Sequence, residues 1–283
     1  MKIAIIGLGL IGASIAKAFK RFTDFEILGC DRDENVMKKA LADGTVDAEL
    51  SDRFAECDII ILGLYPDAAI EFAAQNAEKI SADTIVADVG GVKERVCSGI
   101  YPFAEKYGFT FIGMHPMAGI EKFGYDYSKA DLFKGASLVM TPREGTPEDK
   151  IETLKNVMLP LGFSKIQISS PEEHDRIIAY TSQLAHVVSS SYIKSPTAML
   201  HSGFSAGSFR DMTRVAHLNE IMWTELFLEN AENLSHEIDT VIKHLSEFSE
   251  AIKNGDRELL CRLLRDGREK KDLSDEIDLR KDG

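Results

Sequence analysis

The sequence has few cysteines, and those it has lie far apart. Only four occur among 283 residues, with no CxxC pair and no spacing typical of a zinc finger: Cys30, Cys57, Cys97 and Cys261. In a chain of this length, scattered cysteines are typical of buried, reduced thiols. We therefore expect a protein of the reducing cytoplasm, and we predict no metal site.

The sequence also has no long apolar run. No stretch reaches the ~18 consecutive apolar residues that a transmembrane helix needs, so we expect no membrane partner. The apolar segment that ends at Ile15 contains three glycines at fixed spacing, and it is followed by Lys17, Lys20 and Arg21. We therefore do not interpret it as a signal peptide.

Basic residues are outnumbered by acidic ones. The chain carries 33 Lys and Arg against 46 Asp and Glu, which gives a formal net charge of −13. A polynucleotide would meet net repulsion, and no cluster of basic residues offsets it. Nucleic acid is therefore not an expected partner, although a local cationic site for a small anion stays open.

Up to about residue 168, short β-rich runs alternate with helical segments. Several of the runs are continuously apolar, as expected for strands that helices cover on both faces. This alternation predicts a doubly wound, mostly parallel α/β sheet. The predicted strands are Lys2–Ile6, Glu26–Cys30, Asp58–Gly63, Thr84–Asp88, Thr110–Met114, Ser137–Met140 and Lys165–Ile168.

The character of the sequence changes at residue 170. Ser170 as a helix cap, Pro171 at the first helical position and Glu173 three residues after the cap form a strong helix start. We predict an α/β domain over residues 1–169 and an all-helical domain over residues 170–283, whose charged end, Arg268–Gly283, frays or packs lightly. The predicted helices are His174–Ile193, Phe209–Ala216, Glu220–Leu245 and Arg257–Leu264.

A glycine-rich motif follows the first strand directly. Gly7, Gly9 and Gly12 have the spacing G-x-G-x-x-G and, with Leu10 and Ile11, lead into the first helix. After a strand and before a helix, such glycines allow a tight turn, the approach of a pyrophosphate and close helix–strand packing. The helix N-terminus adds free N–H groups. The motif predicts a Rossmann-type dinucleotide-binding domain.

An acid at the end of the second strand supports this prediction. Asp31 lies 19 residues after Gly12, where a carboxylate bonds the ribose hydroxyls of NAD and repels the extra phosphate of NADP. The neighbouring Arg32 could instead pair with that phosphate or lie against the adenine ring. We predict NAD as the cofactor, with NADP as the alternative.

Open α/β sheets bind ligands at the carboxyl ends of their strands. His115 follows one strand and precedes a proline, and histidine can take a proton near neutral pH when an alcohol loses a hydride. We therefore consider His115 a candidate catalytic residue, although its ring could instead bond a loop carbonyl. On the same ground, six residues that follow two earlier strands are assigned to the cofactor site: Leu64, Tyr65, Pro66, Asp88, Gly90 and Gly91.

The helix predicted over His174–Ile193 has two faces. Ile177, Leu184 and Val188 make the apolar one, while Ser182 and His186 lie on a polar one. The polar face is either exposed to solvent or the wall of a cavity.

Five motifs are long and unusual: Asp88–Lys93, His115–Gly119, Ser182–His186, Ser208–Ala216 and Met222–Asn230. In residues and order they resemble the prephenate dehydrogenase family of tyrosine biosynthesis, and the resemblance extends from residue 3 to about residue 245. It implies NAD(P)-dependent oxidation of a ring hydroxyl, coupled to loss of the ring carboxylate as CO2. It also implies a Rossmann-type domain followed by a helical dimerisation domain.

The resemblance implies roles for individual residues. His115 would hydrogen-bond the ring hydroxyl and receive its proton, and Arg214 would bind a carboxylate of the small dianionic substrate. His186 would line the substrate pocket, to which we also assign Ser182 and Gln183 of the same motif. The later helices would form the interface of a homodimer.

One position departs from the family. Many members have a serine that hydrogen-bonds the catalytic histidine where this chain has Gly91, so either another group or backbone N–H groups and water would orient His115. The nearest alternative activity is arogenate dehydrogenase, the same chemistry on a substrate with an amino group. More distant alternatives are a 3-hydroxy acid or pyrroline carboxylate dehydrogenase and a regulator that binds NAD without turnover.

Overall fold

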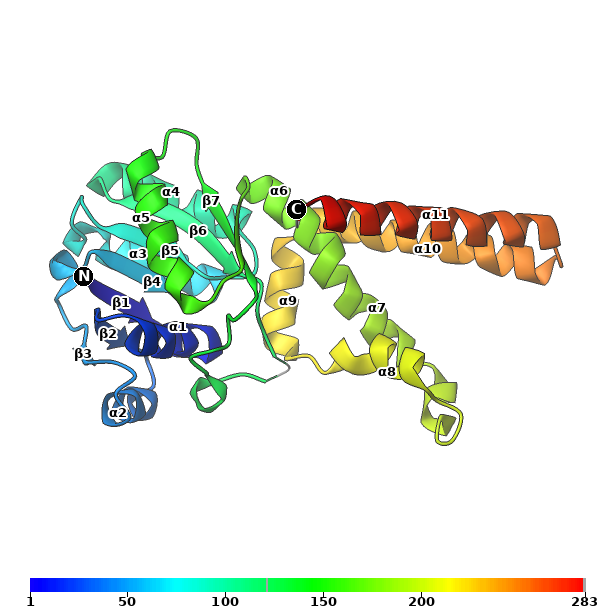
Figure 1. Cartoon of the computed structure of the whole chain (residues 1–283), viewed down its shortest axis with the longest axis horizontal. Helices are drawn as coiled ribbons and strands as arrows, with labels where there is room; N and C mark the ends of the chain where they lie inside the picture. Colours follow the sequence, from blue (N-terminus) through cyan, green and yellow to red (C-terminus); the bar gives the residue numbers. More distant parts are fainter. Residues whose placement is uncertain (121, 282–283) are drawn as a thin grey trace. The chain divides into compact units, whose positions relative to one another are not determined.

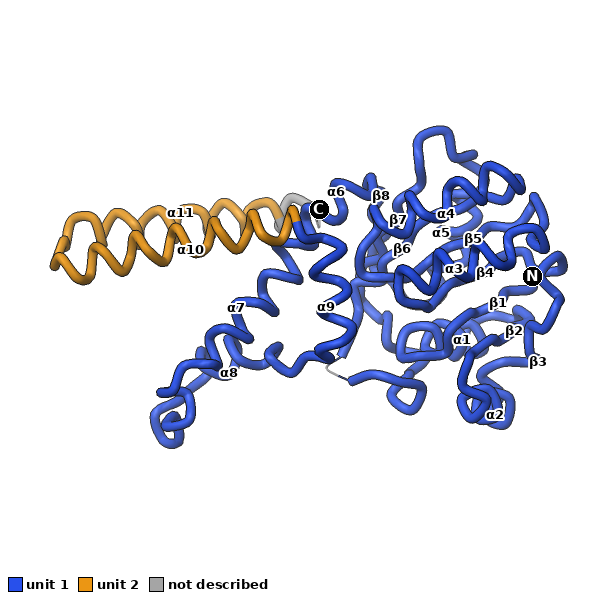
Figure 2. The backbone as a smooth tube through the Cα atoms, turned by 180° about the vertical axis from the view of Figure 1, so that it is seen from behind, with its two compact units in different colours: residues 1–231 blue, residues 232–283 orange. Residues whose placement is uncertain are grey.

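The computed structural model describes residues 1–120 and 122–281. The chain forms two compact units, residues 1–231 and residues 232–283, which are coloured separately in Figure 2. The predicted boundary between residues 169 and 170 falls inside the first unit, and this division into domains stays a prediction.

The first unit is built on one sheet of eight strands in the order β3-β2-β1-β4-β5-β6-β7-β8. All neighbouring strands are parallel except β6 and β7, which confirms the predicted doubly wound, mostly parallel sheet. The chain reverses direction across the sheet between β1 and β4, where such sheets bind their ligands. The strands are β1 (Lys2–Ile6), β2 (Glu26–Cys30), β3 (Ala48–Glu49), β4 (Ile59–Leu62), β5 (Ile85–Asp88), β6 (Thr110–Pro116), β7 (Ser137–Pro142) and β8 (Lys165–Ile168).

Helices cover both faces of this sheet (Figure 1). Alternate residues of a strand point to opposite faces, so Ile3 and Ile5 join one apolar cluster and Ala4 and Ile6 the other. The first cluster lies under α1 (Leu10–Phe22), α2 (Glu34–Ala42) and α5 (Glu148–Met158), and the second lies under α3 (Pro66–Asn76) and α4 (Glu94–Tyr107). Two buried faces explain the continuously apolar strands.

From residue 170 to residue 281, the last that the structure describes, every regular element is a helix. Ser170 caps the first of them as predicted, because its Oγ accepts a hydrogen bond from the Glu173 amide at 3.1 Å. Each of these helices is too short or too polar to cross a membrane. They are α6 (Pro171–Ile178), the π-helix η5 (Ala179–Leu184), α7 (Ala185–Tyr192), the 3-10 helix η6 (Pro196–Leu200), α8 (Gly207–Thr213), the 3-10 helix η7 (Arg214–Ala216), α9 (Glu220–Glu229), α10 (Ala231–Lys253) and α11 (Arg257–Lys281).

The π-helix corrects the prediction of two regular faces on one helix. A π-turn adds a residue to the turn, so positions after it no longer follow the 3.6-residue spacing. Leu184 is buried, but Ile177, which the regular spacing placed on the same apolar face, is 44% exposed. Helical periodicity therefore holds on each side of η5 but not across it.

Two further helix boundaries differ from the prediction. The helix expected over Glu220–Leu245 is interrupted at Asn230, which separates α9 from α10. The helix expected to end at Leu264 continues to Lys281, so the described part from Arg268 onward is not frayed; its side chains up to Ile277 are exposed, which agrees with light packing. Pairs four residues apart support this extension: Lys270 contacts Asp266 at 3.0 Å, and Lys271 pairs with Asp275.

All four cysteines are free thiols, as predicted. Cys57 and Cys97 are buried, and Cys30 is half-buried. The expectation of burial is wrong for Cys261, which is exposed on α11. The reason is that α11 is polar on most of its surface, and it buries few of its side chains within the chain.

Candidate active site

The glycine motif forms a tight loop between β1 and α1. Gly7 has a φ of +86°, and its amide donates to the Cys30 carbonyl at 2.7 Å. A Cβ atom on Gly12 would lie 2.0 Å from the Gly7 carbonyl oxygen, and one on Gly7 would lie 2.4 Å from that of Gly63. A Cβ on Gly9 would meet nothing within 4 Å. The two outer glycines are required for packing, whereas the middle one leaves open space.

The N-terminus of α1 presents its first amides beside that open space. Leu10 and Ile11 begin the helix, Gly9 offers no side chain as a cap, and the first turn contains no acidic residue. Unpaired N–H groups and the positive end of the helix dipole favour a phosphate group at such a position.

Asp31 connects the end of β2 to this loop. Its carboxylate accepts hydrogen bonds from the Leu8 amide at 2.7 Å and from the Asp33 amide at 2.9 Å. Asp31 is half-buried, whereas Arg32 is exposed. The structure therefore brings Asp31, rather than Arg32, to the glycine loop.

The segments after β4 and β5 lie along the same edge of the sheet. Leu64 and the exposed Tyr65 follow β4, and Pro66 begins α3. The loop after β5 is folded back on itself, because the Gly90 amide donates to Asp88 at 2.8 Å. A Cβ built on Gly91 would lie 3.6 Å from the side chain of Leu226 in α9, so α9 approaches this loop closely.

Lys93 is a fully buried cation behind that loop. Its ammonium group pairs with the buried Asp88 carboxylate, and it also donates to the Met114 carbonyl at 2.8 Å. These contacts join the carboxyl end of β5 to that of β6, where His115 lies. A buried charge persists only when it is paired and hydrogen-bonded, so Lys93 stabilises the strand ends.

His115 belongs to a chain of three hydrogen-bonded side chains. Its Nδ1 lies 2.9 Å from Nε2 of His174, and Nδ1 of His174 lies 2.7 Å from the carboxylate of Asp175. His115 is half-buried, and the other two are buried. The hydrogen-bond partner of His115 is thus a second imidazole and not the loop carbonyl considered as an alternative.

Asp175 also caps α4 from a distance. Its carboxylate accepts the amide of Lys93 at 2.7 Å and the amide of Glu94 at 2.9 Å. Acids at a helix N-terminus are stabilised by the free N–H groups and by the helix dipole. The carboxylate that contacts His174 is therefore held by the sheet part of the same unit.

The environment favours neutral imidazole rings. Burial, and then the repulsion that His115 would meet from a protonated His174 and from Lys93, hold the pKa of His115 well below its ordinary value of 6.5. Burial also lowers the pKa of His174, against the opposing effect of Asp175. His115 is consequently available as a proton acceptor at neutral pH.

Four predicted substrate residues follow in the helical part. Gln183 is buried in η5, where its amide nitrogen donates to the Leu226 carbonyl at 3.0 Å and its amide oxygen accepts from Asn230 at 2.8 Å. Ser182 beside it is half-buried. The structure thus gives Gln183 bonds that join η5 to α9.

His186 and Arg214 lie on neighbouring segments. Nδ1 of His186 is 3.0 Å from the Val215 carbonyl, and its ring packs against Trp223 with centroids 4.0 Å apart and the ring planes tilted by 48°. Since a carbonyl only accepts, His186 is protonated on Nδ1. Arg214 precedes Val215 and is exposed, so the bond of His186 brings the segment with Arg214 against α7.

Three carboxylates meet where α3 contacts α9. Oxygens of Asp67, Glu225 and Glu229 lie within 4.8 Å of one another, and Arg95 donates to Asp67 at 2.8 Å. Burial, followed by the charges of Glu225 and Asp67, raises the pKa of Glu229 to about 7. Arg95 offsets part of the repulsion between these carboxylates through its contact with Asp67.

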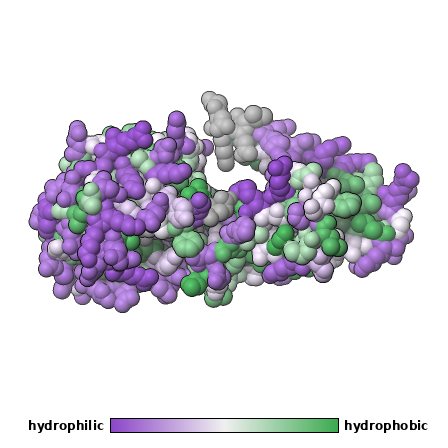
Figure 3. Space-filling view, turned by 90° about the horizontal axis from the view of Figure 1, so that it is seen from below, coloured by the Kyte–Doolittle hydropathy of each residue, from purple (hydrophilic) through white to green (hydrophobic). Residues whose placement is uncertain are grey.

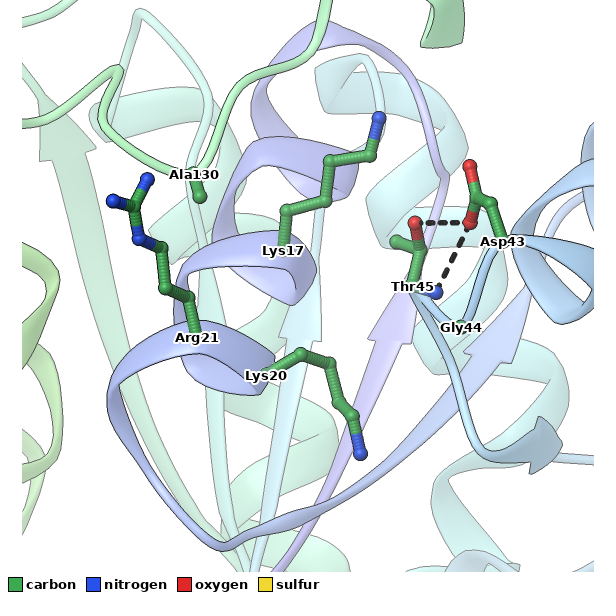
Figure 4. Close-up of a pocket in the computed structure, with 7 residues that line it drawn as sticks. All are labelled: Lys17, Lys20, Arg21, Asp43, Gly44, Thr45 and Ala130. Atoms are coloured by element: carbon green, nitrogen blue, oxygen red, sulfur yellow. Dashed lines mark hydrogen bonds between the residues drawn. The ribbon is translucent and has the colours of Figure 1, made fainter.

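A separate hollow of about 380 Å³ lies beside the later part of α1 (Figure 4). Lys20 at its rim forms a salt bridge with Asp47 at 2.6 Å. The carboxylate of Asp43 accepts hydrogen bonds from the amide and the hydroxyl of Thr45. Neither the glycine loop nor His115 contributes to it, so this hollow is not the dinucleotide site. Its lining residues are Lys17, Lys20, Arg21, Asp43, Gly44, Thr45 and Ala130.

Comparison with known families agrees with this arrangement. Residues 15–166 match the nucleotide-binding domain of prephenate dehydrogenase, and residues 170–266 match its dimerization domain. The chain belongs to the prephenate dehydrogenase family. The matched regions contain β2 to β7, His115 and most of the helices, whereas β1 and the glycine loop precede residue 15.

Relatives of known name support the assignment to the prephenate dehydrogenase family. A cyclohexadienyl dehydrogenase from Zymomonas mobilis is 34% identical over 91% of this chain and 90% of its own length. The structure of a prephenate dehydrogenase from A. aeolicus, in complex with hydroxyphenyl propionate and NAD+, is 29% identical with a TM-score of 0.84 over 96% of this chain and 97% of that one. The structure of an arogenate dehydrogenase from Synechocystis is also 29% identical, with a TM-score of 0.81 over 97% of this chain and 100% of that one.

Sequence reasoning missed four residues of the hydrogen-bonded network: Lys93, His174, Asp175 and Asn230. A signal existed for two of them, since His174 and Asp175 are titratable residues in the first turn of a helix that directly follows a strand. Their partners lie 59 and 82 residues away in sequence, and no spacing rule connects positions so distant.

The glycine loop gives a matched pair of substitutions. Gly12→Ala places a Cβ against the Gly7 carbonyl, so we expect it to lower the free energy of unfolding by about 1–3 kcal/mol. Gly9→Ala enters open space and should change that free energy by less than about 0.5 kcal/mol. If a phosphate approaches Gly9, as the glycine motif predicts, Gly9→Ala should nevertheless weaken NAD binding. Urea unfolding and NAD titration measure both effects, and equal destabilisation by the two substitutions would contradict this account.

Proposed function

We propose that this member of the family is an NAD-dependent enzyme that oxidatively decarboxylates prephenate to 4-hydroxyphenylpyruvate in tyrosine biosynthesis. The observation that carries the proposal is a neutral, hydrogen-bonded His115 at the carboxyl end of β6, beside the loops of a dinucleotide-binding sheet. Residues 1–169 form the cofactor domain in this proposal, and residues 170–283 form the substrate and dimerisation domain.

The residues of the sheet fit NAD. Gly9 leaves the space that a pyrophosphate needs, and the amides of Leu10 and Ile11 face it. Asp31 at the loop suits the ribose hydroxyls. NAD, when bound, supplies the acceptor for the hydride of the substrate. The further cofactor contacts proposed are Leu64, Tyr65, Pro66, Asp88, Gly90 and Gly91.

His115 handles the proton in this reaction. It accepts the proton of the ring hydroxyl while the carbon that bears the hydroxyl loses its hydride. Departure of CO2 leaves the electron pair of the broken bond in the ring, which becomes aromatic. The phenolate oxygen formed in this way takes the proton back from His115. A pKa below 6.5 keeps the imidazole neutral and ready for the first step.

The substrate carries two carboxylates, and Arg214 is the proposed partner for one of them. A guanidinium group matches the planar geometry of a carboxylate and binds it through two hydrogen bonds. The bond between His186 and the carbonyl of Val215 ties the segment of Arg214 to α7. His186, Ser182 and Gln183 are the proposed wall of the pocket on that side.

Arogenate is the alternative substrate. The similarity of this chain to the Synechocystis arogenate dehydrogenase supports arogenate as a second candidate. It undergoes the same ring chemistry, but it carries an amino group where prephenate has a keto group. The residues proposed for the ring, His115 and Arg214, do not distinguish the two. Turnover of each substrate by the purified protein decides between them.

The cofactor assignment predicts a change of preference at Asp31. Formation of NADH from prephenate, followed by absorbance, should be much faster with NAD than formation of NADPH with NADP. Asp31→Ser should narrow or reverse this preference, because it removes the charge that repels a 2′-phosphate. Equal use of both cofactors by the wild-type enzyme would make Arg32 the relevant residue. Absence of turnover with both prephenate and arogenate would refute the proposed function.

Replacement of His115 should affect the chemical step. His115→Asn removes the base, so we expect kcat to fall by about 10²–10⁴-fold with little change in KM. In the wild-type enzyme, activity should be lost only as the pH falls through the lowered pKa of His115, which protonates the base. The acid limb of the kcat/KM profile, which reports the enzyme without substrate, should therefore lie below pH 6.5.

Arg214→Ala serves as the contrasting variant. If Arg214 holds a carboxylate in both the ground state and the transition state, its loss should chiefly raise KM. The expected cost is roughly 2–5 kcal/mol for a desolvated pair. Equal increases in KM with unchanged kcat in both variants would show that His115 only binds, and that the proton leaves by another route.

The exposed helical surface supports a homodimer. Figure 3 shows apolar side chains gathered over the helical part of the chain. Monomeric proteins rarely expose large contiguous apolar patches, and the matched dimerization domain covers these helices. The most exposed large apolar side chains of this part, each above 70% exposed, are Met199, Leu200, Phe204, Ile221 and Leu228.

Light scattering tests the proposed dimer. At micromolar concentration the particle should have the mass of two 31.3 kDa chains. Phe204→Asp should shift the equilibrium toward the monomer without harming the fold, because this side chain is 93% exposed within one chain. Leu159→Asp, at an exposed position in the sheet part, is the control and should leave the dimer intact. A monomeric wild-type protein would exclude the proposal.

A further inference from the structure

The geometry points to His174 and Asp175 as positioning residues that hold His115 in one tautomer, with its proton on Nδ1 and its lone pair on Nε2. This inference rests on the proposed function, because it concerns how His115 is prepared to accept the hydroxyl proton. It also answers how His115 is oriented in a chain that has Gly91 where related enzymes have a serine.

The direction of the hydrogen bonds starts at Asp175. Its carboxylate is 1% exposed and accepts two backbone amides of α4, at 2.7 and 2.9 Å. Both of its oxygens therefore act as acceptors, from donors at the positive end of a helix. An ionised carboxylate only accepts hydrogen bonds, so the proton in the 2.7 Å contact belongs to Nδ1 of His174.

This assignment decides the state of the next ring. Because His174 is neutral and protonated on Nδ1, its Nε2 carries a lone pair. That nitrogen lies 2.9 Å from Nδ1 of His115. It can only accept, so the proton between the two rings belongs to Nδ1 of His115. The remaining ring nitrogen, Nε2, then carries the lone pair that a general base needs.

The charged groups around the two rings favour neutral imidazoles in the hydrogen-bonded chain His115–His174–Asp175, which we call the relay. Lys93 lies behind His115 and disfavours an additional positive charge there, although Asp88 pairs with its ammonium group. Asp175 is the carboxylate in direct contact with His174. When His115 accepts a proton from the substrate, its new charge is therefore stabilised through His174 toward Asp175.

Gly91 makes this relay necessary. It contributes no side chain, and the space at its Cβ position borders the apolar side chain of Leu226 at 3.6 Å. The side-chain partner that the structure gives to His115 comes from α6 instead, 59 residues further along the chain. The orientation of the base thus depends on the docking of α6 against α4.

Two variants of His174 separate positioning from packing. Gln has a terminal oxygen that can accept from Nδ1 of His115, whereas Leu has a comparable size and no acceptor. His174→Leu should lower kcat about 10- to 100-fold with KM nearly unchanged. His174→Gln should retain kcat within about fivefold of the wild type. Equal losses of kcat in the two variants, with both folded by thermal unfolding, would overturn the positioning role.

Nitrogen NMR of histidine-labelled protein reads the tautomer directly and needs no turnover. The signal of His115, identified by its loss in His115→Asn, should show the proton on Nδ1 in the wild type and in His174→Gln. In His174→Leu this preference should disappear. A wild-type His115 protonated on Nε2 would overturn the inference. If neither prephenate nor arogenate reacts, the proposed function fails. The NMR measurement still tests the tautomer of His115, because it does not depend on turnover.

Discussion

The buried carboxylate of Asp175 is the interaction on which the site depends. It caps α4, a helix of the sheet part, and it holds His174 at the start of the helical part. Hydrogen bonds to a charged group contribute about 1.5–3 kcal/mol each, and a buried charge that loses its partners is more costly still. One side chain therefore both joins two parts of a unit and prepares the candidate base.

A second set of buried bonds extends from the same residue. Asn230 donates to the backbone carbonyl of Asp175 and to the amide oxygen of Gln183, both at 2.8 Å. Asn230 stands at the break between α9 and α10, and Gln183 lies in the π-helix. The two irregularities in the helices thus occur where polar side chains meet, and irregular helical turns are frequent at functional sites.

Much of the fold, and the positions of the glycine loop and His115 at the carboxyl ends of their strands, could be predicted from local sequence. Apolar runs such as Ile59–Leu62 are strands because both of their faces are covered, and the glycine loop needs glycine because its neighbours leave no room for a Cβ. The two-residue strand β3 was missed because it is too short for a pattern. The two helix faces predicted across η5 were wrong, because a π-turn changes the spacing of residues around the helix. Nothing in the composition of the segment signals such a turn.

The sequence by itself determined the order of most elements and placed the glycine loop, Asp31 and His115 after their strands, since each depends on neighbouring residues. Only the tertiary structure decided which side chains position His115, because His174, which contacts it, lies 59 residues further along the chain and is held in turn by Asp175. Long-range hydrogen bonds depend on how helices dock on a sheet. Docking follows from packing over the whole unit, which no local pattern encodes.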